Sequence, residues 1–343
     1  GSASAAASSA STAASTLASK ADTTYVDSQI GAINVSTVST TAPSSPAAGD
    51  MWFDTTIGTT AMKVWSGSEW NQMSNKFSAT GGTESTYGNY KVHTFTSSGT
   101  FTAEASGSVD VLVVAGGGPG GSSFGGGGGA GGYISQTGYS VSPTSYSITI
   151  GAGGTVPYNN AQGSKGGNTT AFGYTALGGG PGGCQGIYSP GQASLSGGSG
   201  GSNSHNTSYH GLGTSGQGYD AGHTTQYGNP YSEAGGGGAS EAGVSNTNAT
   251  VSMRGGNGAT WLNGSTYAGG GGGGGGGSGY NVNTSGAVGG SGGGGNAGSS
   301  ANTSGANGGA NTGGGGGGSH SYNNASYKGG NGGSGIVIVR YVV

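Results

Sequence analysis

The residue types that carry out acid, base and metal chemistry are sparse and scattered in this sequence. Eleven carboxylates and five histidines are spread over 343 residues, and the carboxylates form no pair suited to general acid and base catalysis. No two histidines combine zinc-like spacing with a cysteine or carboxylate beside them, although His205 and His210 lie close together. We therefore predict that the protein is not an enzyme and holds neither a metal nor another cofactor.

Glycine-rich stretches that follow a strand can bind dinucleotides, and two stretches fit that pattern. Residues 116–121 and 125–132 match the G-x-G-x-x-G fingerprint. Such matches are expected by chance in a chain with 88 glycines, and no Gly-Lys-Ser/Thr follows either of them. The sequence therefore gives no reason to expect a nucleotide site.

Tyrosine, histidine and asparagine gather in the polar segments between the glycine runs, and they are the positive sign of a binding site. Tyrosine gives contact area at a low conformational cost and adds a hydroxyl, and its ring can stack on sugars. The alternative is that these side chains only cover the ends of a glycine-rich scaffold. The candidate receptor-binding residues are Tyr188, His205, Tyr209, His210, Tyr219, Tyr227, Tyr231, Trp261, Tyr267, Tyr280, His320, Tyr322 and Tyr327.

The elements that must present these loops are glycine runs, of which 269–277 is the longest. A run without side chains forms neither an amphipathic helix nor a half-buried strand, so it is either disordered or packed through its backbone. We favour packing as polyglycine II helices, which have three residues per turn and no internal hydrogen bonds. Neighbouring helices must then satisfy every N–H and C=O group, and a Cβ at a shared axis would push them apart.

The predicted glycine core lies within this longest run. Its members are Gly269, Gly271, Gly273, Gly275 and Gly277. We expect the run to be a buried helix near the centre of the bundle, so that Gly273→Val would disrupt the packing.

Apolar strands frame the glycine tract. The run 109–114 is apolar enough to be a buried strand, and 335–341 mirrors it at the other end of the tract. We expect both to lie in one sheet, which would close the glycine region at its base. The prediction is a β framework over 90–150 and 335–343, with a polyglycine II bundle over 116–335 inserted in it.

The first 80 residues have a different character. Small apolar residues from Ala3 to Ala21 recur at alternating spacings of four and three, which predicts an α-helical coiled-coil stalk over 1–40. A flexible Ala/Ser linker is the alternative. Short strand patterns with three of the four tryptophans predict a small antiparallel β module over 41–80, which leaves 81–343 as the glycine-rich tip domain. The expected fold class is thus mostly β and irregular behind a helical stalk.

Charge and hydropathy limit the partners. Only 6% of residues are charged, with 8 Lys and Arg against 11 Asp and Glu. Nucleic acid and anionic membrane surfaces both require a basic face, so we expect neither as a partner. No apolar run approaches the ~18 residues of a membrane span, so no membrane insertion is expected.

The layout resembles a bacteriophage tail-fibre receptor-binding protein. The resemblance is carried by the Ala/Ser stretch ending in Ala21-Asp22-Thr23-Thr24-Tyr25-Val26-Asp27, by Gly49-Asp50-Met51-Trp52-Phe53-Asp54 with Trp65-Ser66-Gly67-Ser68-Glu69-Trp70, and by the tip from Thr94 to Tyr341. It implies a homotrimeric fibre in the virion, joined to more proximal fibre parts. Its distal loops would bind a protein or polysaccharide of the bacterial surface, as in adhesins with polyglycine sandwiches.

A second class of function stays open. Glycine-rich chains also form extracellular filaments, and a polyglycine bundle can bind ice. Ice binding needs a flat, regular face of small side chains, whereas these glycine runs are interrupted at uneven lengths by tyrosine and asparagine.

Overall fold

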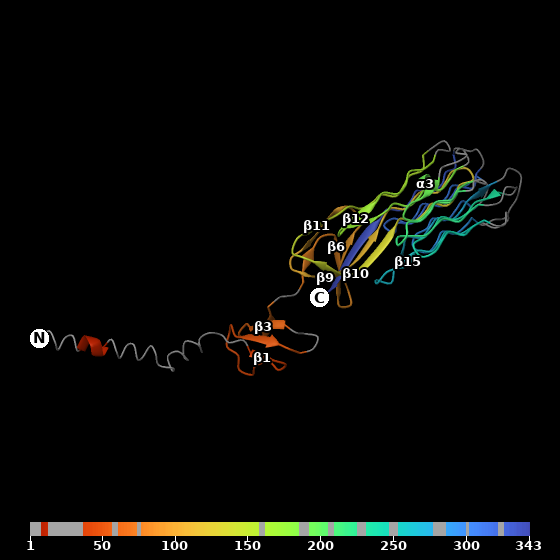
Figure 1. The fold of residues 1–343 in the computed structure, drawn as a ribbon. Coiled ribbons are helices and arrows are strands. Elements are labelled where there is room, and N and C mark those ends of the chain that lie inside the picture. Colours follow the sequence, from red (N-terminus) through yellow and green to blue (C-terminus); the bar gives the residue numbers. More distant parts are fainter. Residues whose placement is uncertain are drawn as a thin grey trace. The chain divides into compact units, whose positions relative to one another are not determined.

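The fold is taken from a computed structural model, which divides the chain into two compact units, Gly1–Phe77 and Ser78–Val343 (Figure 1). No described helix is long and apolar enough to cross a membrane. The described residues are 8–12, 37–56, 61–73, 77–157, 162–184, 192–204, 209–224, 231–246, 253–276, 286–299, 302–321 and 326–343.

The predicted coiled-coil stalk is wrong. The structure is almost entirely β, and its described helical residues are limited to 8–12 and the one-turn helix α3 (Gln192–Leu195). Residues 8–12 are all exposed, and the Thr12 hydroxyl donates to the Ser8 carbonyl oxygen at 2.9 Å. Serine and threonine are weak helix formers, and alanine offers little surface to bury at a heptad seam. The rest of 1–36 lies outside the described residues, and the homotrimer that this stalk was to form stays a prediction.

The first unit contains a four-stranded sheet in the order β1, β2, β3, β4. Strands β2 (Met51–Asp54), β3 (Ala61–Trp65) and β4 (Trp70–Gln72) are antiparallel neighbours and match the predicted strand positions. Strand β1 (Thr37–Ser39) pairs in parallel with β2. The sheet is therefore mixed rather than purely antiparallel, and it begins inside the stretch that was assigned to the stalk.

Aromatic rings and one ion pair stabilise this small sheet. Trp52 is buried, and its ring centroid lies 5.5 Å from that of Trp70. The Lys63 ammonium lies 4.6 Å from the centroid of the Trp52 ring and 2.8 Å from the Asp54 carboxylate. The hydrogen bond from Lys63 lowers the pKa of the Asp54 carboxyl to about 2. The tryptophans that stand out in the sequence are thus the packing centre of this unit.

The second unit begins with two facing antiparallel sheets. The larger has the order β10, β9, β18, β7, β6 and the smaller the order β11, β8, β5. Their strands are β5 (Ala79–Thr80), β6 (Thr83–Tyr87), β7 (Tyr90–Phe95), β8 (Gly99–Ala103), β9 (Gly107–Val114), β10 (Tyr133–Val141), β11 (Ser145–Ile148) and β18 (Ile336–Val342).

A histidine lies in the core between these sheets. The ring centroid of His93, on β7, lies 5.3 Å from that of Phe101, on β8, and both side chains are fully buried. His93 Nδ1 lies 2.7 Å from the Gly81 carbonyl oxygen, and Nε2 lies 3.3 Å from the Tyr341 hydroxyl. The imidazole thus has polar partners on both ring nitrogens inside an apolar layer.

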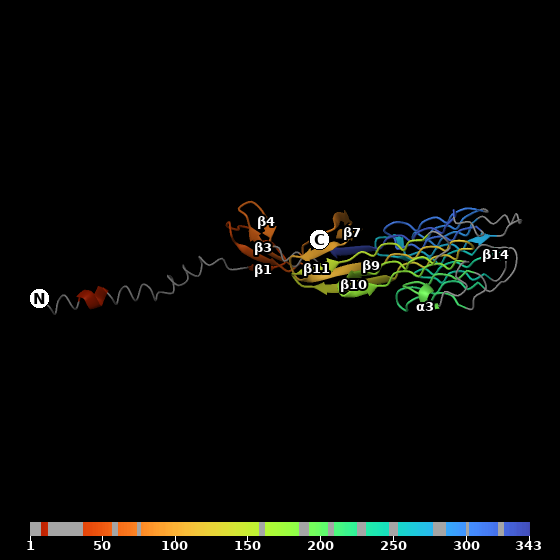
Figure 2. The same cartoon turned by 90° about the horizontal axis from the view of Figure 1, so that it is seen from above.

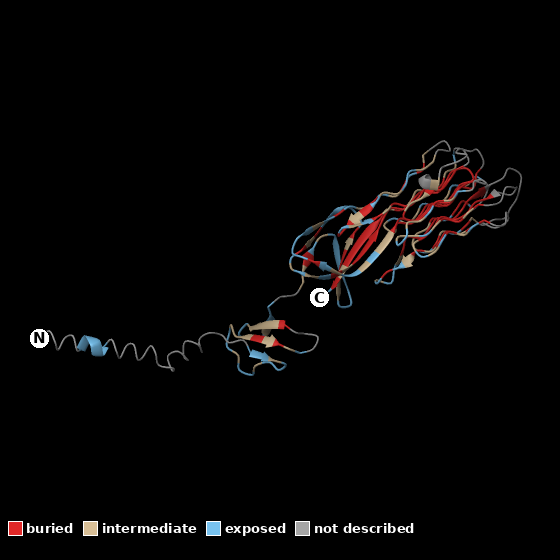
Figure 3. Cartoon of the chain, in the orientation of Figure 1, coloured by how far each residue is buried: buried red, intermediate tan, exposed pale blue. Residues whose placement is uncertain are grey.

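Strands β9 and β18 are buried over most of their length (Figure 3). They are antiparallel neighbours, with Val113 opposite Val337. This confirms the expectation that the strands before and after the glycine tract share a sheet. The pairing of β9 with β18 continues past the strands, because the Gly117 N–H donates to the Gly333 carbonyl oxygen at 2.9 Å. The glycine tract is therefore closed at its base.

Beyond the sheet the chain forms extended glycine-rich segments that run side by side along the unit (Figures 1 and 2). We call each segment a rod and name it by its residues. Rod 125–132, which leads into β10, shows how the rods are joined. Its N–H groups donate in rotation to three neighbouring rods. Gly126, Gly129 and Gly132 donate to rod 177–183. Gly127 and Ala130 donate to rod 234–237, and Gly128 and Gly131 donate to rod 313–316.

The carbonyl groups of rod 125–132 follow the same rotation. They accept from rods 115–121, 199–202 and 271–274. Every third residue therefore faces the same neighbour, which is the period of a polyglycine II helix. Among the described residues, six rods enclose this one and satisfy its backbone.

The longest glycine run forms a second enclosed rod. Residues 269–275 are buried, and the N–H groups of 269–274 donate in rotation to rods 292–295, 253–256 and 125–128. A Cβ at Gly273 would overlap the carbonyl oxygens of Glu233 and Ala234. Gly275 lies in β17, and Gly277 lies outside the described residues.

Three short strand pairs complete the second unit. All are antiparallel two-stranded ladders. They are β12 (Thr169–Ala171) with β13 (Tyr174–Ala176), β14 (Tyr231–Ser232) with β17 (Gly275–Gly276), and β15 (Ala259–Thr260) with β16 (Thr266–Tyr267).

A single methyl group inside the bundle should destabilise it. Gly273→Ala must displace two backbone carbonyls, and overpacking of this kind costs about 1–3 kcal/mol or more. We expect a lower melting temperature by circular dichroism. Gly99→Ala is the control, because a Cβ there would lie 3.7 Å from the Phe95 ring, an ordinary contact. Equal melting of both variants and the parent would contradict backbone packing at Gly273.

Acidification should destabilise the second unit. Burial lowers the pKa of His93 below the 6.5 of a free imidazole, against the opposing hydrogen bond to Gly81. The unfolded chain then binds a proton that the folded chain excludes, so stability is complete above about pH 6.5 and falls as the pH decreases below it. Melting temperatures measured from about pH 7.5 to 5.5 should drop less for His93→Gln than for the parent. The prediction fails if the two proteins show the same drop.

Candidate functional site

Part of the predicted receptor-binding set lies outside the described residues. These members are Tyr188, His205, Tyr227, Tyr280 and Tyr322. The described members occupy two regions of the bundle, one at the end next to the sheets and one at the opposite end. Their exposure differs strongly, which decides what each can contact.

Trp261 and Tyr267 lie at the sheet end and are buried, with 4% and 8% of their surface exposed. They belong to the β15–β16 hairpin and pack against the apolar residues of β7, β9 and β18. Trp261 Nε1 donates to the hydroxyl of Ser135, on β10, at 3.1 Å. The structure therefore places these two aromatic side chains in the packing between sheet and bundle rather than on an accessible surface.

Arg340 fixes this junction. Its guanidinium lies 4.1 Å from the Tyr90 ring centroid and 5.6 Å from that of Trp261. Its Nε donates to the Asp110 carboxylate at 3.0 Å, and its Nη1 donates to the Leu262 carbonyl oxygen at 3.0 Å. One side chain thus connects the hairpin to three strands of the large sheet.

At the opposite end, buried hydroxyl groups take over as hydrogen-bond partners of the backbone. Thr224 Oγ1 accepts from the Ala234 N–H at 3.1 Å, and Ser319 Oγ accepts from the Ser123 N–H at 2.8 Å. His320 is part of this layer, with 5% of its surface exposed, and burial lowers its pKa. From the sequence, His320 was assigned to receptor binding. In the structure it belongs, with Thr224 and Ser319, to a buried layer that closes the ends of the rods.

Three of the other described members at this end, Tyr209, His210 and Tyr327, have less buried side chains. Tyr327 is half-buried, and Tyr231 lies on β14. Tyr209 is exposed over 49% of its surface. His210 follows it in sequence and is intermediate in exposure.

His210 contacts a histidine that sequence reasoning did not single out. The ring centroids of His210 and His223 are 5.3 Å apart, and His210 Nδ1 and His223 Nε2 are buried without a hydrogen-bond partner among the described residues. Burial and the nearby His223 lower the pKa of His210, and Asp220 opposes the shift. No group of three or more potential metal ligands occurs in the described ranges. The lowered pKa favours the neutral form of His210 beside the His223 ring.

The segment 209–219 is the part of the predicted set that remains open to a partner. It begins at Tyr209 and ends at Tyr219, which are 49% and 50% exposed. Its residues line two grooves, one on each side of the turn at 215–217.

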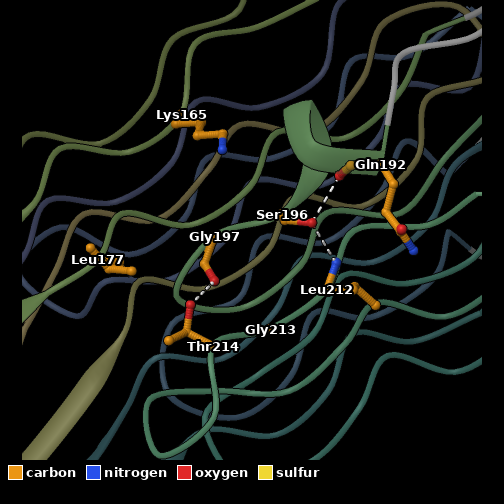
Figure 4. Close-up of a pocket in the computed structure, with 8 residues that line it drawn as sticks. All are labelled: Lys165, Leu177, Gln192, Ser196, Gly197, Leu212, Gly213 and Thr214. Atoms are coloured by element: carbon orange, nitrogen blue, oxygen red, sulfur yellow. Dashed lines mark hydrogen bonds between the residues drawn. The ribbon is translucent and has the colours of Figure 1, made fainter.

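The first groove, which we call the lysine groove, has a volume of about 450 Å³ (Figure 4). Leu177 and Leu212 give it apolar walls, and Lys165 is the charged side chain among its lining residues. Hydrogen bonds fix its rim: Ser196 Oγ accepts from the Leu212 N–H, and Thr214 Oγ1 donates to the Gly197 carbonyl oxygen, both at 2.9 Å. The lining residues are Lys165, Leu177, Gln192, Ser196, Gly197, Leu212, Gly213 and Thr214.

The second groove, which we call the tyrosine groove, has a volume of about 420 Å³. Two tyrosines line it, Tyr219 from the segment 209–219 and Tyr133 from the start of β10. Within the described ranges, no carboxylate, lysine, arginine or histidine lines it. The lining residues are Tyr133, Ser215, Gly216, Gln217, Gly218, Tyr219, Ala239 and Ala259.

Gln217 holds the turn between the two grooves. Its Oε1 accepts from the Leu177 N–H at 2.8 Å, and its Nε2 donates to the Thr175 carbonyl oxygen at 3.0 Å. Its backbone carbonyl accepts from the Tyr133 N–H at 2.9 Å. Sequence reasoning missed both Gln217 and Tyr133, because Tyr133 is part of a strand and Gln217 stands alone between two glycines.

The chain was compared with known proteins and families. A family model described as a glycine-rich domain matches residues 94–342, from the end of β7 to the last residue of β18. No curated protein matches the sequence at a significant level. Since the match covers most of the chain and contains every rod described above, the chain belongs to the glycine-rich domain family.

Proposed function

We propose that the chain is a non-enzymatic adhesin that forms the distal part of a phage tail fibre. It would act outside the cell, at the surface of a bacterium, and would recognise a surface protein or glycan. Its other partners would be the more proximal fibre parts of the virion.

The observation that carries this proposal is the separation of scaffold from contact surface. The core rods satisfy one another through backbone groups, as around rod 125–132, and side chains take part at the rod ends and at the turn. Accessible tyrosines remain at Tyr209 and Tyr219. Tyrosine on a rigid support, next to serine and glycine, is typical of surfaces that recognise other molecules.

The grooves beside the segment 209–219 fit binding rather than catalysis. The lining residues that the structure describes include no histidine, cysteine or carboxylate that could act as nucleophile or base. The two cavities, at about 450 and 420 Å³, lie in the size range of small-molecule sites. An adhesin would use such grooves for parts of a larger receptor.

Binding to bacterial cells tests the proposal directly. Fluorescently labelled chain, added to a panel of Gram-negative and Gram-positive strains, should bind some strains and not others. A strain that binds the chain is then pretreated either with periodate or with protease. Only one treatment should abolish binding: periodate if the receptor is a glycan, protease if it is a protein.

Immunogold microscopy tests the location. Antibodies against the chain should label the ends of tail fibres on phage particles produced together with it. Label on filaments of the cell surface, together with no strain-specific cell binding, would contradict the proposal and favour a structural filament. Thermal hysteresis of the purified chain would instead favour ice binding.

A further inference from the structure

We infer that the tyrosine groove is a binding site for a neutral sugar ring, with Tyr133 and Tyr219 as the contact residues. This inference rests on the proposed adhesin function and names the chemistry of the receptor part that this groove would hold. It concerns the described side chains of the groove alone.

The first argument is the chemistry of the lining. The two tyrosines supply aromatic faces and hydroxyl groups, and Ser215 supplies an exposed hydroxyl. Ala239 and Ala259 add small apolar surface, and the lining carries no charged side chain. A sugar ring has one apolar face that can stack on an aromatic ring and hydroxyl groups that need hydrogen-bond partners. A charged ligand would find no counter-charge in the lining to offset its desolvation.

The second argument is that the backbone of Tyr219 is held in place before any ligand arrives. The Tyr219 N–H donates to the Gly238 carbonyl oxygen, and the Tyr219 carbonyl accepts from the Gly200 N–H, both at 3.0 Å. Tyr219 is thus part of the rod network, yet half of its surface is exposed. A large ring that the fold leaves accessible on a fixed backbone loses little conformational freedom on binding.

The third argument is the position of Tyr133. Its backbone is tied to the turn through the bond from its N–H to the Gln217 carbonyl oxygen. Its side chain packs partly against the buried cluster around Trp261, and burial raises its pKa, so its hydroxyl stays protonated near neutral pH. Tyr133 is therefore tied to the turn that leads into Tyr219.

The open side of the turn also fits a ligand. Gly216 has φ +77°, and a Cβ built there would meet nothing within 4 Å. At about 420 Å³ the groove is at the small end of ligand sites, which run from ~300 to ~1,000 Å³. It therefore suits one end of a glycan rather than a folded protein surface. The lysine groove differs, because Lys165 would favour an anionic group there.

Saturation-transfer NMR and calorimetry with methyl glycosides of glucose, galactose, mannose and N-acetylglucosamine test the inference on the full chain. At least one of them should bind, and glucuronic and N-acetylneuraminic acid should bind more weakly. Tyr219→Ala should weaken binding at least about tenfold, whereas Tyr219→Phe should retain most of it. Tyr87→Ala is the matched control, because Tyr87 is 61% exposed on β6 and does not line the groove.

Two results would overturn the inference. One is that no neutral glycoside binds. The other is that Tyr219→Ala binds as tightly as the parent with an unchanged melting temperature. Cell binding separates this failure from that of the proposed function: a Tyr219→Ala chain that still binds cells leaves the adhesin in place with another contact surface, whereas a parent chain that binds no cell removes the adhesin itself.

Discussion

The second unit depends on rods that approach so closely that a Cβ has no room. At Gly128, for example, an added Cβ would overlap the carbonyl oxygens of Gly118 and Pro119 on the neighbouring rod. This close approach is what brings each N–H within hydrogen-bond distance of a carbonyl on the next rod. Pro119 and Pro181 remain within buried rods because proline has the φ of this extended helix.

The threefold rotation of hydrogen bonds explains how a chain without a fixed repeat builds a regular bundle. Rod 125–132 has both parallel and antiparallel neighbours, because its bonds run to 234 and then 237 in one direction and to 183 and then 177 in the other. A rod therefore accepts neighbours from any part of the sequence in either direction. The segments between rods differ in length and composition, and the fold leaves half of the Tyr219 surface exposed within this network.

The N-terminal error and the unequal exposure of the predicted site residues share a cause, which is that residue type and spacing do not specify tertiary contacts. The heptad spacing from Ala3 to Ala21 says where small residues would meet, but alanine and serine bury too little surface for spacing alone to make a helix. Aromatic residues between glycine runs were treated as one class of loop residue. Tyr219 is exposed and Trp261 is buried, because Trp261 meets Arg340 and the large sheet, and nothing near Trp261 in the sequence signals that contact.

The sequence by itself determined that the glycine runs are either disordered or packed by their backbone, and it predicted that the strands at 109–114 and 335–341 close the tract in one sheet. These follow from local facts: a missing side chain and an apolar run. Only the tertiary structure decided which rods enclose 125–132 and 269–274, that Gln217 ties a turn to β10 and β13, and that Tyr133 and Tyr219 share a groove. The contacts of Gln217 and the pairing of Tyr133 with Tyr219 join residues 40 or more positions apart. For the rods, segments made of one residue type carry no signal for choosing among partners.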